Sequence, residues 1–206
     1  MLNMMTGSRS ALLIVDVQKD FCRGGALEVP NGDSVVAPLN RYAAEAVARG
    51  WSVYASRDWH PRVTSHFQQY GGEWPPHCVQ GTEGAAFHDD LRLPESAIVI
   101  TTGEGPDEPG YSALEGHNPN GTNFLDDLKA RGIDHLYVGG LATDYCVKHS
   151  VLDARRAGLE VTVLTDAIAG VEVNVGDSAR ALEEMRAAGA RFAGHLSEDQ
   201  APTHKL

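Results

Sequence analysis

Cys146 is the side chain in this sequence that is best placed to act as a nucleophile. It lies in the segment GGLATDYCVKHS, residues 139–150, where an apolar run ends in two glycines and a helical pattern over residues 144–156 begins. At such a turn the first N–H groups of the helix lack backbone partners, and the positive end of the helix dipole is close. An isolated cysteine is more often a small buried hydrophobe. The position of Cys146 instead predicts a thiol with a lowered pKa and N–H donors for an oxyanion.

Asp16 is a second candidate, within the apolar segment ALLIVDV, residues 11–17. A nearly continuous apolar run is typical of a central parallel strand that is buried on both faces. Open α/β sheets bind their ligands at the carboxyl ends of such strands. Because Asp16 lies at the carboxyl end of one predicted strand and Cys146 follows another, we expect them at the same edge of the sheet.

A third group of candidates lies between residues 58 and 88, a segment with little helical or strand periodicity. Connections of this length are usually functional or disordered, and the aromatic residues here argue against disorder. The segment contains the spacing D-x-H-x5-H-x10-H, formed by Asp58, His60, His66 and His77. Three imidazoles and one carboxylate suit a single divalent ion such as Zn, Fe or Mn, with positions open for water or substrate. Solvated loop histidines are the alternative explanation.

The elements that must position these groups alternate between strand and helix along the chain, which predicts an α/β fold with a doubly wound parallel sheet. The chain shows no linker or internal repeat, so we expect one domain over residues 1–206. The predicted strands cover residues 11–17, 51–57, 97–101, 135–141, 159–165 and 190–193. The predicted helices cover residues 34–49, 121–131 (with Thr122 as N-cap), 144–156 and 176–188.

Composition narrows the class of partner. The chain has 206 residues, a net charge of -11 and 42% hydrophobic residues, which describes an ordinary globular protein. This charge argues against nucleic acid or an anionic membrane, since both attract basic patches. Three cysteines without scaffold-like spacing suit a reducing compartment, so we expect a cytoplasmic protein. No apolar run approaches the roughly 18 residues of a membrane span.

Five motifs, taken together, resemble the nicotinamidase branch of the isochorismatase-like cysteine hydrolases. They are DVQKDF at 16–21, RDWHP at 57–61 followed by His66, WPPHCVQGT at 74–82, GYSALEG at 110–116 and GGLATDYCV at 139–147. The resemblance runs from about residue 11 to residue 191. It implies a six-stranded parallel sheet with helices on both faces, and hydrolysis of nicotinamide, a small aromatic amide, to nicotinate and ammonia. A monomer or small homo-oligomer is expected.

The resemblance also implies roles for particular residues. The general base would be Asp16 and the nucleophile Cys146. The oxyanion hole would use the backbone N–H groups of Ala142 and Cys146, with a cis peptide before Ala142. The walls of the substrate pocket would be Phe21, Trp74 and Tyr111. The metal ligands would be Asp58, His60, His66 and His77. This assignment fits general chemistry, since a thiolate can attack an amide once a neighbouring base takes its proton.

Glu104 departs from the family pattern, in which a catalytic lysine precedes the tyrosine of the Y-S motif by seven residues. Here Glu104 stands seven residues before Tyr111. A carboxylate beside Asp16 would make the thiolate of Cys146 harder to form, because like charges raise one another's pKa. We therefore expect ligand and metal binding with slow hydrolysis. A shifted loop could instead leave Glu104 in solvent. The sequence is also compatible with a non-catalytic nicotinamide- or nicotinate-binding protein, and with an amidase for a non-aromatic amide.

Overall fold

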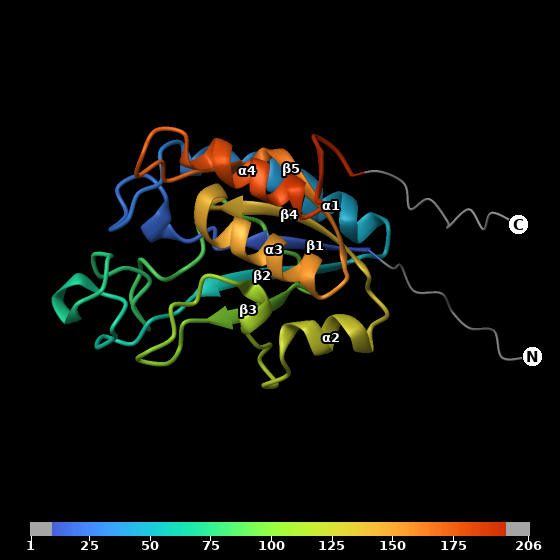
Figure 1. Cartoon of the computed structure of the whole chain (residues 1–206). Helices are drawn as coiled ribbons and strands as arrows, with labels where there is room; N and C mark the ends of the chain where they lie inside the picture. Colours follow the sequence, from blue (N-terminus) through green and yellow to red (C-terminus); the bar gives the residue numbers. More distant parts are fainter. Residues whose placement is uncertain (1–9, 197–206) are drawn as a thin grey trace, which may run out of the picture.

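A wholly parallel sheet of six strands organises residues 10–196, the part of the chain that the computed structural model describes (Figure 1). The strand order is β3-β2-β1-β4-β5-β6. The strands are β1 Ser10–Val15, β2 Ser52–Asp58, β3 Ile98–Thr102, β4 His135–Leu141, β5 Glu160–Ala169 and β6 Arg191–Ala193. The helices are α1 Val36–Ala48, α2 Phe124–Ala130, α3 Lys148–Arg156 and α4 Asp177–Ala187. The predicted single domain includes chain ends that lie outside the described residues.

Short helical turns lie between these elements. The 3-10 turns are η1 Lys19–Phe21, η2 Gly32–Val35, η3 Gln68–Tyr70 and η4 Ala113–Glu115, and a π-helical turn, η5, covers Thr143–Val147. None of the helices within residues 10–196 is long and apolar enough to cross a membrane.

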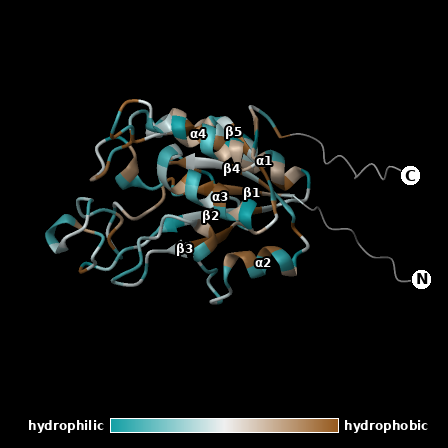
Figure 2. Cartoon of the chain, viewed as in Figure 1, coloured by the Kyte–Doolittle hydropathy of each residue, from teal (hydrophilic) through white to brown (hydrophobic). Residues whose placement is uncertain are grey.

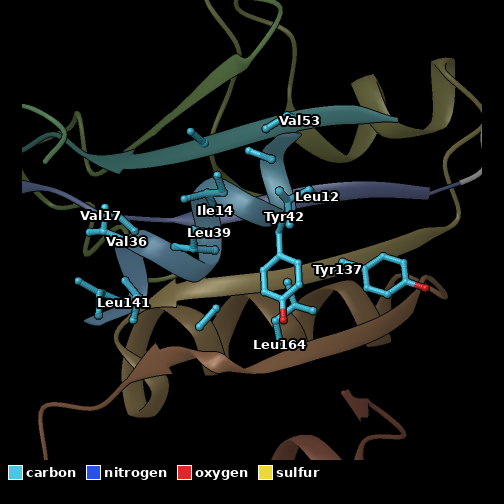
Figure 3. Packing of buried hydrophobic residues seen from close by; sticks show 14 of the residues in the cluster. Leu12, Ile14, Val17, Val36, Leu39, Tyr42, Val53, Tyr137, Leu141 and Leu164 are labelled. Carbon is cyan, nitrogen blue, oxygen red and sulfur yellow. The ribbon is translucent and has the colours of Figure 1, made fainter. Parts of the chain in front are cut away.

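Alternate residues of β1 supply the two halves of the core, because successive strand side chains point to opposite faces. Leu12 and Ile14 pack on the face covered by α1, next to Leu39 (Figure 3). Leu13 and Val15 pack on the opposite face, which α2, α3 and α4 cover. All six residues of β1 are buried, as expected of a central strand between two helical layers. Figure 2 shows the resulting pattern, with hydrophobic colour in β1 and β3 and both colours on the amphipathic α2.

The order of the strands places a crevice between β1 and β4. The chain continues from β1 to β2 and β3 on one side, and then returns to pair β4 with the other side of β1. Ligand sites of open parallel sheets lie at such a reversal, outside the carboxyl ends of the two strands. Asp16 follows β1 directly, and the π-helical turn η5 follows β4 after one residue. The predicted candidates therefore lie at this position.

Local differences from the predicted elements have identifiable causes. Thr122 is not the N-cap of α2; Asn123 is, because its side-chain oxygen accepts the N–H of Leu125 at 3.0 Å. The same side chain donates to the carbonyls of Leu114 and Gly116, which fixes the entry to the helix. The helix predicted to begin at residue 144 is π-helical through residue 147, and α3 begins after it.

Candidate active site

Asp16 is buried at the end of β1 in an unusual backbone conformation, with φ of 47°. Ser56 Oγ donates to Asp16 Oδ1 at 2.7 Å, and the thiol of Cys146 donates to the same carboxylate. Burial, followed by the charge of Asp58, raises the pKa of Asp16 to about 7 and outweighs the opposing hydrogen bonds. Asp16 can therefore exchange a proton near neutral pH, which suits a general base.

Cys146 lies in the π-helical turn, with its side chain partly exposed toward a pocket. Burial, and then the negative charges of Asp16 and Asp58, raise the pKa of the thiol well above its ordinary value. The expectation of a lowered thiol pKa is therefore wrong. The helix-terminus argument considered only the local turn, whereas the two carboxylates reach the thiol from β1 and β2. Attack by Cys146 thus requires transfer of its proton to Asp16.

The peptide bond between Leu141 and Ala142 is cis, as the resemblance implied. Ala142 and Cys146 line the same pocket. The carbonyl oxygen of Ala142 accepts the N–H groups of Tyr145 and Val147, at 3.0 and 3.1 Å. These bonds fold residues 142–147 into one turn around the thiol.

Aromatic side chains from four connections, those that follow β1, β2, β3 and β4, line the pocket. Trp74 Nε1 donates to the hydroxyl of Tyr111 at 2.8 Å, which joins the long loop after β2 to the loop after β3. Tyr145 meets Trp74 edge to face at 4.9 Å between ring centroids. Phe21 also lines the pocket, with its ring centroid 5.5 Å from that of His77. The complete lining is Phe21, Leu27, Asp58, His66, Trp74, His77, Pro109, Tyr111, Ala142, Tyr145, Cys146 and Val171.

The structure brings the three predicted histidine ligands together, with Asp58 next to two of them, and Asp58, His66 and His77 also line this pocket. Nitrogen atoms of His60, His66 and His77 lie within 4.8 Å of one another. Asp58 Oδ1 lies 2.9 Å from His60 Nε2, and Asp58 Oδ2 lies 3.3 Å from His77 Nε2. Despite this proximity, Asp58 Oδ1 and both ring nitrogens of His60 are buried without a well-directed hydrogen bond. Buried polar atoms are normally paired, so this arrangement fits atoms directed at a cation.

The protonation of two of the histidines also fits a metal site. His77 Nδ1 lies 2.7 Å from the carbonyl oxygen of Pro75, an acceptor, so Nδ1 carries the proton and Nε2 keeps its lone pair. Burial and the neighbouring His60 lower the pKa of His66 to about 4, so His66 is neutral at physiological pH. Neutral imidazole is the form that binds metal ions.

Cys22, Asp33 and His88 form a second group of potential metal ligands. In this group the histidine has no nitrogen lone pair free to bind a metal. The backbone N–H of Asp90 donates to His88 Nδ1 at 3.1 Å, so the neutral ring carries its proton on Nε2, which faces Asp33 Oδ1 at 3.2 Å. Nε2 therefore has no lone pair for a metal. Burial, and then Asp33, raise the pKa of Cys22 to about 11. We interpret this group as hydrogen-bonded support for the surrounding loops.

Residues 10–196 match the family described as Isochorismatase domain. The chain belongs to the isochorismatase family. Escherichia coli nicotinamidase is 46% identical to it over 196 residues, which cover 87% of this chain and 92% of that protein. Mycobacterium tuberculosis nicotinamidase/pyrazinamidase is 45% identical over 181 residues, covering 86% and 95%. The crystal structure of Pyrococcus horikoshii pyrazinamidase in complex with zinc superposes with a TM-score of 0.84 at 40% identity, covering 91% of this chain and 100% of that chain.

Glu104 lies outside the pocket of this isochorismatase-family chain. Its exposed side chain pairs with His117 Nε2, and it lines a separate acidic hollow with Asp107 and Glu108. The expectation that Glu104 acts on Asp16 is therefore corrected: neither Asp16 nor Cys146 has Glu104 among the charges that shift its pKa. The loop after β3 turns the side chain away into solvent.

Several lining residues of the isochorismatase-family pocket were missed in the sequence. Tyr145 could have been found, because it directly precedes the nucleophile candidate in a turn. Leu27, Pro109 and Val171 come from loops without a distinctive motif, and only the fold brings them together. The described lining contains no lysine or arginine, so the positive groups that act on Asp16 and Asp58 are the histidines, His77 on Asp16 and both His60 and His77 on Asp58.

Proposed function

We propose that this isochorismatase-family protein hydrolyses nicotinamide, and by the same chemistry pyrazinamide, to the carboxylic acid and ammonia. The observation that carries the proposal is the hydrogen bond from the Cys146 thiol to Asp16 in an aromatic pocket. The names of the relatives, nicotinamidase and nicotinamidase/pyrazinamidase, support the choice of substrate. The aromatic walls favour a flat ring over an aliphatic amide.

In the first half-reaction, ionised Asp16 accepts the proton of Cys146 as the thiolate attacks the amide carbon. The tetrahedral oxyanion is bound by the backbone N–H groups of Ala142 and Cys146, and loss of one such donor typically costs about 100-fold or more. Protonated Asp16 then donates its proton to the leaving nitrogen. The C–N bond breaks, ammonia departs, and a thioester at Cys146 remains.

In the second half-reaction, Asp16 accepts a proton from a water molecule that attacks the thioester. The oxyanion forms again at the same N–H donors. The C–S bond breaks, the carboxylic acid leaves, and the proton on Asp16 returns to the sulfur of Cys146. Atoms and charge balance over the cycle, and no external oxidant or reductant is needed.

We further propose that Asp58, His60, His66 and His77 hold one divalent ion, Zn, Fe or Mn. The orphaned buried atoms of Asp58 and His60 support this, as does the Pyrococcus horikoshii pyrazinamidase, whose structure is a complex with zinc. When bound, the ion supplies a Lewis-acidic position for the ring nitrogen of a pyridine or pyrazine amide. The roles of Phe21, Trp74 and Tyr111 are to hold the ring by packing.

We also propose that turnover is slow. The cause is not Glu104, as the sequence suggested, but the lining of the pocket. Glu104 pairs with His117 outside the pocket, but the described pocket lining has no lysine or arginine to stabilise the thiolate of Cys146 against Asp16 and Asp58. If the thiolate of Cys146 were too poorly stabilised to form, the protein would bind its ligand without hydrolysing it.

The test is ammonia release by metal-quantified protein from nicotinamide, pyrazinamide and an aliphatic amide, with Cys146→Ser as control. We expect release from both aromatic amides, little from the aliphatic amide, and none above background with Cys146→Ser. Equal rates for wild type and Cys146→Ser at full metal content would refute the proposal.

A further inference from the structure

Asp144 is a buried carboxylate to which neither the resemblance nor the proposed mechanism assigns a role. It lies in the π-helical turn of Cys146, with a relative exposure of 5%. Its Oδ1 accepts the backbone N–H of Val171 at 2.9 Å, and its Oδ2 accepts the N–H of Glu172 at 2.8 Å. Hydrogen bonds to an ionised acceptor are among the stronger ones in proteins. Asp144 therefore joins the nucleophile turn to the segment that follows β5.

That segment forms part of the pocket. Val171 is one of the lining residues, together with Cys146. The neighbouring Glu172 has a φ of 55°, and its carboxylate accepts the N–H groups of Gly176 and Ser178, at 2.9 and 2.8 Å, at the start of α4. The segment is thus held at one end by Asp144 and at the other by α4. Without Asp144, the described hydrogen bonds leave the N–H groups of Val171 and Glu172 without a partner.

The close approach of the two segments leaves little room for adjustment. A Cβ atom at Gly170 would lie 3.2 Å from Asp144 Oδ1 and 1.9 Å from Ser178 Oγ, so a side chain there would require the serine hydroxyl to rotate away and Asp144 to shift slightly. Gly170 directly precedes Val171 and Glu172, whose N–H groups donate to Asp144, so the backbone at residue 170 lies against the Asp144 carboxylate. The carboxylate of Asp144 is thus packed closely against the segment that it binds, as a positioning residue requires.

From these contacts we infer that Asp144 is a positioning residue: it fixes the Cys146 turn and the Val171 wall relative to each other. This inference rests on the proposed amide hydrolysis. Loss of the tether moves the thiol relative to Asp16 and loosens one wall of the pocket. Both kcat and KM are then affected, since displacement of a reacting group by about 1 Å can cost 100-fold.

The experiment compares Asp144→Asn and Asp144→Ala with Asp153→Asn, a matched control on α3 whose carboxylate accepts from Arg156 instead. Asparagine keeps the shape of the side chain but offers one acceptor oxygen for two donors. The readouts are kcat and KM for nicotinamide, the rate of iodoacetamide alkylation at Cys146 by mass spectrometry, and Tm. We expect kcat/KM to fall roughly 10- to 100-fold in the Asp144 variants, with slower alkylation at neutral pH. Asp153→Asn should match the wild type.

Two results distinguish failure of the tether from failure of the proposed function. Alkylation and kcat/KM within about twofold of wild type, with only Tm reduced, would show that Asp144 is purely structural and overturn the inference. If the wild type releases no ammonia, the proposed function fails, but the alkylation rates still test the tether. If Asp144→Ala does not fold, Asp144→Asn decides the outcome.

Discussion

The thiol of Cys146 donates a hydrogen bond to the carboxylate of Asp16, although the two residues lie far apart in the sequence. The contact exists because β1 and β4 are neighbours in the sheet and the two residues follow their carboxyl ends. Each group changes the acidity of the other. The carboxylate raises the pKa of the thiol, while the hydrogen bond from the thiol lowers that of the carboxylate. The pair therefore works through proton transfer rather than through a preformed thiolate.

The pH dependence of hydrolysis should report this pair. Burial, and then Asp58, raise the pKa of Asp16 to about 7, and only its ionised form accepts the thiol proton. We expect kcat/KM to be level above about pH 7 and to fall about tenfold per pH unit below it. Ser56→Ala removes a hydrogen bond that lowers this pKa, so the midpoint should move to higher pH. Profiles that are flat across neutral pH at constant metal content would contradict this.

Glu104→Lys should leave kcat within about threefold of the wild type, because exposed charges interact weakly. Glu104 is exposed and pairs with His117, away from the thiol. Had Glu104 slowed hydrolysis from within the site, as the sequence led us to expect, this change would instead give a large gain. Steady-state kinetics at low and moderate salt measure the effect, and an increase of orders of magnitude would restore Glu104 to the active site.

Thr102→Lys should behave differently. The sheet register pairs Thr102 with Asp58, so β3 brings residue 102, rather than 104, to the level of the metal ligands. An ammonium group there would offset the carboxylates that hold the pKa of Cys146 high, and each unit of lowering gives about tenfold more thiolate. We expect kcat to increase about tenfold. The measurement is kcat together with the pH dependence of Cys146 alkylation, and an unchanged alkylation profile in a folded variant would argue against it.

Removal of one proposed metal ligand should weaken metal binding while the protein still folds. His66→Ala should bind metal at least about tenfold more weakly, whereas His117→Ala, outside the pocket, should retain it. Chelation of the wild type should lower Tm, because the buried atoms of Asp58 and His60 would lose their partner. Elemental analysis and thermal unfolding on the same samples test this. Full metal content in His66→Ala would exclude the assignment.

Acid stability should depend on Asp127, a buried residue of α2. Burial raises its pKa, but hydrogen bonds from Tyr54 Oη at 2.6 Å and Arg131 Nε at 2.8 Å outweigh burial and lower it. A lowered folded-state pKa stabilises the protein above the unfolded value, and this contribution is lost as pH falls through the folded value. Tyr54→Phe should cost about 1–3 kcal/mol at pH 7 and less in acid. Urea unfolding against pH measures this, with the exposed Asp126→Asn as control; a cost independent of pH would contradict it.

The sequence predicted the elements with strong local signals. The buried strand before Asp16 has a continuous apolar run, and the spacing of His60, His66 and His77 is visible in one loop, so both were found. The raised pKa of Cys146 was not predicted, because burial in the folded chain, and then charges from other parts of the sheet, determine it. The direction of Glu104 depends on how the loop after β3 turns, which residue counting cannot supply. The contact of Asp144 with the segment after β5 is likewise non-local.

The central claim is that Cys146 forms a thioester with the substrate, and trapping this species tests it most directly. Metal-loaded protein is mixed with nicotinamide, quenched in acid within seconds and digested, and the peptide that contains Cys146 is weighed. We predict a nicotinoyl adduct on Cys146 that appears together with one equivalent of ammonia and is absent in Asp16→Asn. Ammonia release without any adduct, undiminished in Cys146→Ser, would contradict the account.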